Sequence, residues 1–126
     1  MYDIAIIEDE PEVARTMVTM LSLMIKDQVE TCVYTSLREF MDADHDPDVI
    51  LLDLNLPDSK GAKTAEHIGA ISNAPIVILT ADDDPATKHR IEALGYEYYV
   101  KPDAYGAAEA IAAAMYHKYY SEPVNG

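Results

Sequence analysis

Short apolar runs alternate along this chain with longer segments of mixed polarity. The runs at residues 2–7, 29–34, 48–53, 75–80 and 98–100 are rich in isoleucine, valine, leucine and tyrosine, which favours β-strands. The run at 48–53 is almost continuously apolar between two aspartates, as is typical of a strand buried on both faces of a parallel sheet. The pattern therefore predicts five strands.

The segments between the runs predict five helices. From residue 11 to 26, apolar side chains recur at spacings of three and four, which places them on one helix face. Ser36 and Glu39 have the spacing of a capping box, and Asp84 followed by Pro85 is a typical helix start. We expect helices over residues 11–26, from 37 onward, over about 60–72 with a thin apolar face, from 85 to Gly95, and over 104–120.

Strands that alternate with helices specify an α/β fold with a doubly wound parallel sheet, helices on both faces and right-handed crossovers. In such a fold, sites form beyond the carboxyl ends of the strands. Four of the five predicted strand ends carry polar side chains suited to one site, namely Glu8, Asp9, Asp53, Thr80 and Lys101.

These residue types indicate phosphoryl chemistry at a metal ion. Carboxylates gathered at one sheet edge repel each other, and Mg²⁺ suits them because it takes a few carboxylate oxygens and keeps water ligands. An aspartate so placed can be a nucleophile that forms an acyl phosphate, and Asp53 is the best candidate because its strand is the most apolar. We expect Asp9 to bind the metal directly, Glu8 directly or through water, and Asn55 through its backbone carbonyl.

Composition narrows the classes of partner. The 126 residues are enough for one domain, and 23 acidic against nine basic side chains give a formal charge of −14, which opposes binding to nucleic acid or a membrane surface. The single cysteine, Cys32, cannot form an internal disulfide. The first residues do not fit a secretory signal, and no run approaches the ~20 apolar residues of a membrane span, so we expect a cytoplasmic protein.

Taken together, the motifs resemble one family. Glu8-Asp9, Asp53-Leu54-Asn55-Leu56-Pro57 with Gly61, Thr80-Ala81, and Lys101-Pro102 after the aromatic Tyr98 follow the pattern of the receiver domain of two-component response regulators. The resemblance implies a flavodoxin-like or CheY-like (βα)5 three-layer sandwich whose five strands have the order 2-1-3-4-5. It covers residues 1–120 and leaves 121–126 as a short C-terminal tail.

The resemblance also assigns roles to the residues. Asp53 would accept a phosphoryl group from a sensor histidine kinase or a phosphotransfer protein, with Mg²⁺ bound or Mn²⁺ as an alternative ion. Thr80 and Lys101 would contact the phosphoryl group, and Asp82 could influence a water molecule that attacks it. Tyr98, or Tyr99 because the Gly95–Lys101 segment is one residue short, would be the aromatic switch. The Lys101–Pro102 peptide bond would be cis.

Output is expected to pass to another protein. The resemblance implies a downstream protein target on the face made by the fourth helix, fifth strand and fifth helix, where most of the tyrosines fall, and a monomer or weak homodimer. The last predicted helix ends at residue 120 of 126, so we expect a stand-alone receiver without a DNA-binding or enzymatic output domain. Such a receiver would catalyse only its own phosphorylation and dephosphorylation. Asp103 stands where the family more often has an apolar residue.

Three alternatives remain open. A haloacid-dehalogenase-like phosphohydrolase also uses an aspartate nucleophile, Mg²⁺, a threonine and a lysine, but would need a second aspartate at the position of Asn55 and the nucleophile on the first strand. A phosphorylation-independent interaction module could keep the fold, and the chain could be a fragment of a longer regulator.

The acidic segment 42–48 is interpreted as a solvated connection, and His45 and the other histidines show no ligand spacing.

Overall fold

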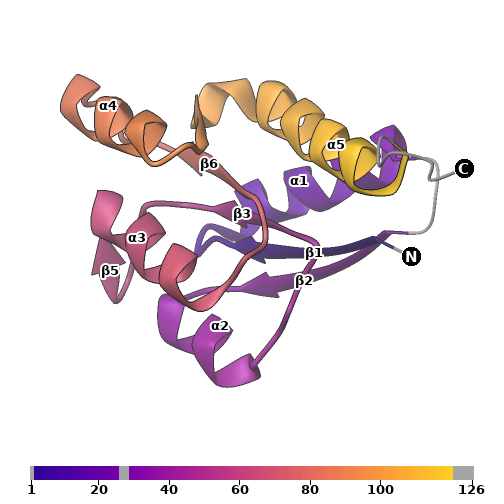
Figure 1. Cartoon of the computed structure of the whole chain (residues 1–126), viewed down its shortest axis with the longest axis horizontal. Coiled ribbons are helices and arrows are strands. Elements are labelled where there is room, and N and C mark those ends of the chain that lie inside the picture. Colours follow the sequence, from indigo (N-terminus) through magenta and orange to yellow (C-terminus); the bar gives the residue numbers. More distant parts are fainter. Residues whose placement is uncertain (1, 26–28, 121–126) are drawn as a thin grey trace, which may run out of the picture.

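The computed structural model describes residues 2–25 and 29–120, with the side chains of 117–120 left out, so the predicted tail 121–126 lies outside the described residues. The main sheet has five parallel strands in the order β2-β1-β3-β6-β7 (Figure 1). Counted within this sheet, the order is the expected 2-1-3-4-5. The strands are β1 (Tyr2–Ile7), β2 (Val29–Tyr34), β3 (Val49–Leu52), β6 (Ile76–Thr80) and β7 (Glu97–Val100).

Two further short strands lie outside the main sheet. Strands β4 (Asn55–Leu56) and β5 (Ser59–Lys60) form a small antiparallel hairpin directly after β3. The hairpin is closed by a hydrogen bond from Gly61 N–H to Leu54 O at 2.9 Å, and Gly61 adopts a φ of 76°, which favours glycine. The sequence pattern did not predict this hairpin, because two-residue strands carry no periodic signal.

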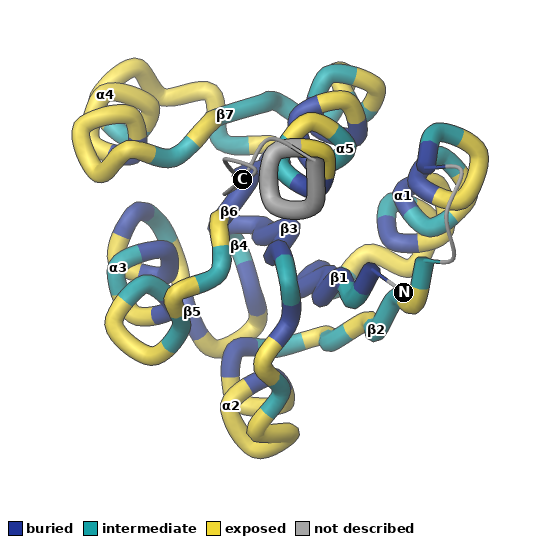
Figure 2. Tube along the Cα trace, turned by 45° about the vertical axis from the view of Figure 1, so that its right-hand side comes forward, coloured by how far each residue is buried: buried dark blue, intermediate teal, exposed yellow. Residues whose placement is uncertain are grey.

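Five helices cover the two faces of the sheet (Figure 2). On one face α1 and α5 pack over the sheet through a cluster that includes Met17, Leu21 and Ile111. On the other face α2, α3 and α4 pack through Phe40, Ile68 and Ile91. The helices are α1 (Pro11–Met24), α2 (Leu37–Ala43), α3 (Ala62–Ile71), α4 (Pro85–Ala93) and α5 (Ala104–Tyr120). These layers confirm the predicted α/β fold.

The predicted helix starts are present, with one difference in detail. Ser36 accepts a hydrogen bond from Glu39 N–H, which is half of the expected capping box. The Glu39 carboxylate instead accepts from Thr35 N–H and from Thr35 Oγ1. Asp58, from the β4–β5 turn, accepts from Leu37 N–H and from Arg38 N–H, so a distant residue completes the cap of α2.

One expectation about the backbone is wrong. No described peptide bond is cis, so the Lys101–Pro102 bond is trans. After β7 the chain enters a 3₁₀ turn over Lys101–Asp103 that leads into α5, and helical turns are built from trans peptides.

Asp103 caps this junction, because its Oδ1 accepts a hydrogen bond from Gly106 N–H at 3.0 Å. The unusual aspartate therefore has a local structural role.

No helix among residues 2–25 and 29–120 is both long enough and apolar enough to cross a bilayer.

Candidate phosphoryl-acceptor site

The carboxyl ends of β1 and β3 bring the first acidic residues together. Asp53 N–H donates to Ile7 O at 3.0 Å, which continues the β1–β3 ladder by one residue and fixes the start of both loops. Glu8 N–H donates to Tyr34 O at 2.8 Å and so fixes the other side of the same loop. The side chains of Glu8 and Asp53 are consequently buried, at 3% and 2% exposure.

Lys101 joins these two carboxylates. Its Nζ lies 3.1 Å from Glu8 Oε1 and 3.1 Å from Asp53 Oδ2, and it also forms an ion pair with the exposed Glu10. The lysine is placed by β7, which pairs with β6 and ends at Val100. Three of the strand ends that the sequence singled out therefore meet in space, those of β1, β3 and β7.

Burial and neighbouring charge shift the titration of this cluster. Burial, opposed by a hydrogen bond from Glu10 N–H and reinforced by the Asp53 charge, raises the pKa of Glu8 to about 7. Burial lowers the pKa of Lys101, but its ion pairs with Glu10, Asp53 and Glu8 outweigh this and raise it overall. The lysine is thus held as a cation beside a carboxylate whose proton affinity is high.

The oxygens present fit a hard divalent cation. Carboxylate oxygens of Glu8, Glu10 and Asp53 lie within 4.8 Å of one another. Three carboxylates against one ammonium group leave a formal excess of two negative charges, which a divalent ion would neutralise. Oxygen ligands of this kind are those that Mg²⁺ and Mn²⁺ prefer.

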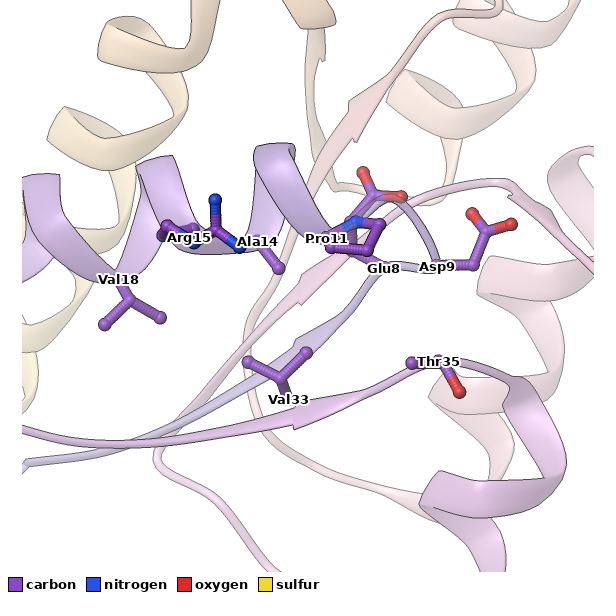
Figure 3. Close-up of a pocket in the computed structure, with 8 residues that line it drawn as sticks. All are labelled: Glu8, Asp9, Pro11, Ala14, Arg15, Val18, Val33 and Thr35. Carbon is purple, nitrogen blue, oxygen red and sulfur yellow. The ribbon is translucent and has the colours of Figure 1, made fainter.

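Asp9, which was expected to bind the metal directly, is not part of this cluster in the structure. Glu8 and Asp9 both line a pocket between α1 and β2, and Figure 3 shows their carboxylates pointing in different directions from the loop. Glu10 is the third acid of the cluster, a role that the sequence motifs do not indicate. Its backbone N–H donates to Glu8 Oε2 at 3.1 Å, a loop contact that no sequence pattern indicates.

Asn55 lies at the entrance of the hairpin, where its N–H donates to Asp53 Oδ1 at 3.1 Å. This contact orients the Asp53 carboxylate, so that Oδ1 faces the loop while Oδ2 faces Lys101. Thr80 ends β6 and is fully buried, and its Oγ1 accepts a hydrogen bond from Asp82 N–H at 3.3 Å. Thr80 and Asp82 therefore share one turn at the end of the next strand.

The two tyrosines of β7 face opposite layers. Tyr98 packs with the α2–α3–α4 cluster, and its hydroxyl oxygen is buried without a hydrogen-bond partner among the described residues. Burial, together with the charges of Asp82–Asp84, raises the pKa of Tyr98 to about 12. Tyr99 packs with the α1–α5 cluster and donates from its hydroxyl to Glu97 Oε1 at 3.0 Å. Of the two, Tyr98 is the one on the α4 side.

Comparison with known proteins places this geometry in a family. The family model described as "Response regulator receiver domain" matches residues 4–111. The chain belongs to the response regulator receiver domain family. That match covers the strands and loops that carry all of the residues discussed above, and it agrees with the resemblance seen in the sequence motifs.

Relatives of this receiver domain are longer proteins. It is 31% identical over 111 residues to the transcriptional regulatory protein KdpE of Mycobacterium tuberculosis, covering 86% of this chain and 47% of that protein. It is 35% identical over 117 residues to the sensory transduction protein RegX3 of the same species, covering 89% and 48%. The chain thus spans about half the length of the curated relatives it matches.

Solved structures agree on the fold. A two-component response regulator from Clostridium difficile superimposes with a TM-score of 0.81 at 17% identity, covering 94% of this chain and 99% of that one. A CheY-like receiver domain protein from Methanospirillum hungatei gives a TM-score of 0.79 at 16% identity, covering 97% and 99%. At these low identities the likeness shows a shared fold only.

Proposed function

We propose that this receiver domain is a phosphorylation-dependent switch whose acceptor is Asp53. The observation that supports this most directly is the ion pair of Lys101 Nζ with Asp53 Oδ2 at 3.1 Å, inside a buried acidic cluster. An Asp53 oxygen forms the new bond to phosphorus, while the bond from phosphorus to the donor histidine nitrogen breaks and the imidazole keeps its electron pair. The donor is a sensor histidine kinase or a phosphotransfer protein.

The chain's own residues prepare this step. Asn55 N–H holds one Asp53 oxygen, which leaves the other beside Lys101 for the incoming phosphoryl group. The lysine ammonium group stabilises the negative charge of the transferred oxygens. Glu8, Asp53 and the backbone carbonyl of Asn55 would hold Mg²⁺ or Mn²⁺. Asp9 would be a ligand in place of Glu10, because Glu10 is paired with Lys101. When bound, the ion neutralises charge on the carboxylates and on the phosphoryl oxygens.

Phosphorylation would then be read through Thr80 and Tyr98. Thr80 Oγ1 is buried and accepts a hydrogen bond from Asp82 N–H, which leaves the hydroxyl proton of Thr80 available for donation to a phosphoryl oxygen on Asp53. The hydroxyl of Tyr98 is buried and has no hydrogen-bond partner in the part of the chain that the structure describes, so the side chain can change position at low cost in hydrogen bonding. The partner surface is the α4–β7–α5 face, where Leu94, Tyr105 and Tyr116 are 42%, 58% and 60% exposed.

The acceptor assignment is tested by intact mass. Protein incubated with Mg²⁺ and a small phosphodonor should gain one phosphoryl group, and Asp53→Asn should abolish the gain. Asp58→Asn is the matched control, because Asp58 lies nearby in the β4–β5 turn but is exposed and bound to the start of α2. Labelling that survives Asp53→Asn, or that Asp58→Asn removes, would refute the proposal.

A further inference from the structure

A second group of metal-binding side chains lies at the β1–β2 edge of the sheet. An oxygen of Asp3, a ring nitrogen of His45 and Cys32 Sγ all lie within 4.8 Å of one another. Asp3 is near the start of β1, whereas Glu8 follows its end, and at about 3.3 Å per residue the two positions are roughly 17 Å apart. This group is therefore separate from the cluster around Asp53.

The sheet itself brings two of the three residues together. In the β1–β2 register Asp3 is opposite Glu30 and Ala5 is opposite Cys32. Because side chains alternate along a strand, Asp3 and Ala5 share a face, and the small Ala5 side chain leaves room beside Cys32. Asp3 and His45 have 36% and 15% exposed side chains, and Cys32 is also partly exposed, so an ion can enter from solvent.

The third residue, His45, is held in place from both sides. Its Nε2 lies 2.8 Å from both oxygens of the Asp3 carboxylate, and its Nδ1 lies 2.7 Å from Tyr34 Oη. The segment after His45 is fixed by two hydrogen bonds between Asp3 and Asp48, one from each backbone N–H. The ring of Tyr34 packs edge-on against Phe40 at 5.3 Å. The position of the imidazole is therefore set before any ion binds.

Tyr34 supplies the outer contact that metal-binding histidines need. A ligating histidine usually donates its other ring N–H to a fixed acceptor, which sets the tautomer and orients the ring. With the proton on Nδ1 and donated to Tyr34 Oη, Nε2 presents a lone pair on the side of Asp3. Without a metal, the side chains of Asp3, His45 and Tyr34 form a hydrogen-bonded chain, which Cys32 joins through the Tyr34 hydroxyl. A metal site is favoured because a carboxylate oxygen, an imidazole nitrogen and a thiol sulfur lie within 4.8 Å of one another.

We propose that Asp3, Cys32 and His45 bind one divalent cation of the Zn²⁺ type, with water as a fourth ligand. Thiolate and imidazole ligands select Zn²⁺ over Mg²⁺, and three protein ligands plus water complete a tetrahedron. Ligand atoms in such a site lie roughly 3.3–3.6 Å apart, so side-chain rotations must draw the group slightly closer than its present limit of 4.8 Å. On binding, the Cys32 thiol proton is released to solvent and sulfur takes its place on the metal as thiolate.

Cobalt substitution tests this site directly. Protein without a polyhistidine tag is titrated with Co²⁺ under a phosphine reductant and excess Mg²⁺, which occupies the cluster around Asp53. One equivalent of Co²⁺ should give a thiolate-to-cobalt charge-transfer band and the strong visible absorption of tetrahedral cobalt, and Zn²⁺ should displace both signals. Cys32→Ser should abolish the charge-transfer band, while Tyr34→Phe, which keeps the packing on Phe40, should weaken binding about tenfold.

Two more variants keep the test decisive if Cys32→Ser folds poorly by circular dichroism. His45→Gln should weaken Co²⁺ binding at least as much as Tyr34→Phe. His89→Gln, on the exposed face of α4, should leave it unchanged. Absence of a charge-transfer band, or a band that His45→Gln leaves intact, would refute the site.

Discussion

Lys101 Nζ lies 3.1 Å from Asp53 Oδ2, and this ion pair joins the end of β7 to the end of β3. The same ammonium group contacts Glu8 at the end of β1, so one side chain bridges three strands of the sheet. Under the proposed function, this arrangement holds the acceptor Asp53 and Lys101 in contact before any phosphoryl group arrives.

Removing Lys101 should destabilise the domain in the absence of Mg²⁺. Lys101→Gln leaves Glu8 and Asp53 buried without their cation, which we expect to lower the free energy of unfolding by about 2–3 kcal/mol. Urea unfolding measures this loss, and added Mg²⁺ should reduce it because the ion replaces the missing charge. Lys88→Gln, on the exposed surface of α4, is the control and should change stability by less than about 0.5 kcal/mol. Equal effects of the two variants would contradict the bridging role.

Two neighbouring acids should differ in their effect on Mg²⁺ binding. If Asp9 is a direct ligand as proposed, Asp9→Asn should weaken Mg²⁺ affinity by about tenfold or more. Glu10 has a 59% exposed side chain and contacts Lys101, so Glu10→Gln should change the affinity by no more than about fivefold. Isothermal titration of both variants measures the difference, with Glu12→Gln as a control for loss of one exposed charge. The reverse order would assign the metal to the Glu8, Glu10 and Asp53 cluster seen in the structure.

Asp58 should make the stability of the domain depend on pH. Hydrogen bonds from Arg38 N–H and Leu37 N–H hold the pKa of Asp58 below its usual value. Its contribution is therefore complete above the unfolded-state pKa of about 4 and is lost as pH falls through the lower folded-state pKa. Asp58→Asn should cost about 1 kcal/mol at pH 7, as for loss of a helix cap, and less in strong acid.

Urea unfolding of wild type and Asp58→Asn across this pH range gives the comparison. Asp83→Asn, exposed in the loop before α4, serves as the control for loss of one negative charge. A difference between wild type and Asp58→Asn that stayed constant from neutral pH to strong acid would show that the carboxylate does not act as the cap.

Removing the hydroxyl of Tyr98 should stabilise the unphosphorylated protein. That oxygen is buried and makes no hydrogen bond to residues 2–25 or 29–116, so Tyr98→Phe should raise the free energy of unfolding by about 1 kcal/mol. Thermal unfolding at constant pH measures the gain. Tyr99→Phe removes a hydroxyl that bonds to exposed Glu97 and should change stability by less than about 0.5 kcal/mol. A loss of stability in Tyr98→Phe would indicate a partner for this hydroxyl.

Local patterns in the sequence predicted the main elements well because each rests on neighbouring residues. The strand at 29–34 and the helix at 104–120 have the predicted bounds, and the starts at Pro11, Ser36 and Asp84 are present. The hairpin after β3 and the trans bond at Lys101–Pro102 were missed. Both depend on how the loops at the strand ends close against the rest of the domain, which no local period encodes.

The sequence by itself determined the order of strands and helices, the polar residues at the strand ends and the family, because apolar periodicity and short motifs are local properties of the chain. Only the tertiary structure decided which side chains meet. It placed Glu10 rather than Asp9 against Lys101, Asp58 on the start of α2, and Cys32 beside His45. These contacts join residues far apart in sequence or depend on side-chain directions, and both are set by the packing of the folded sheet and its loops.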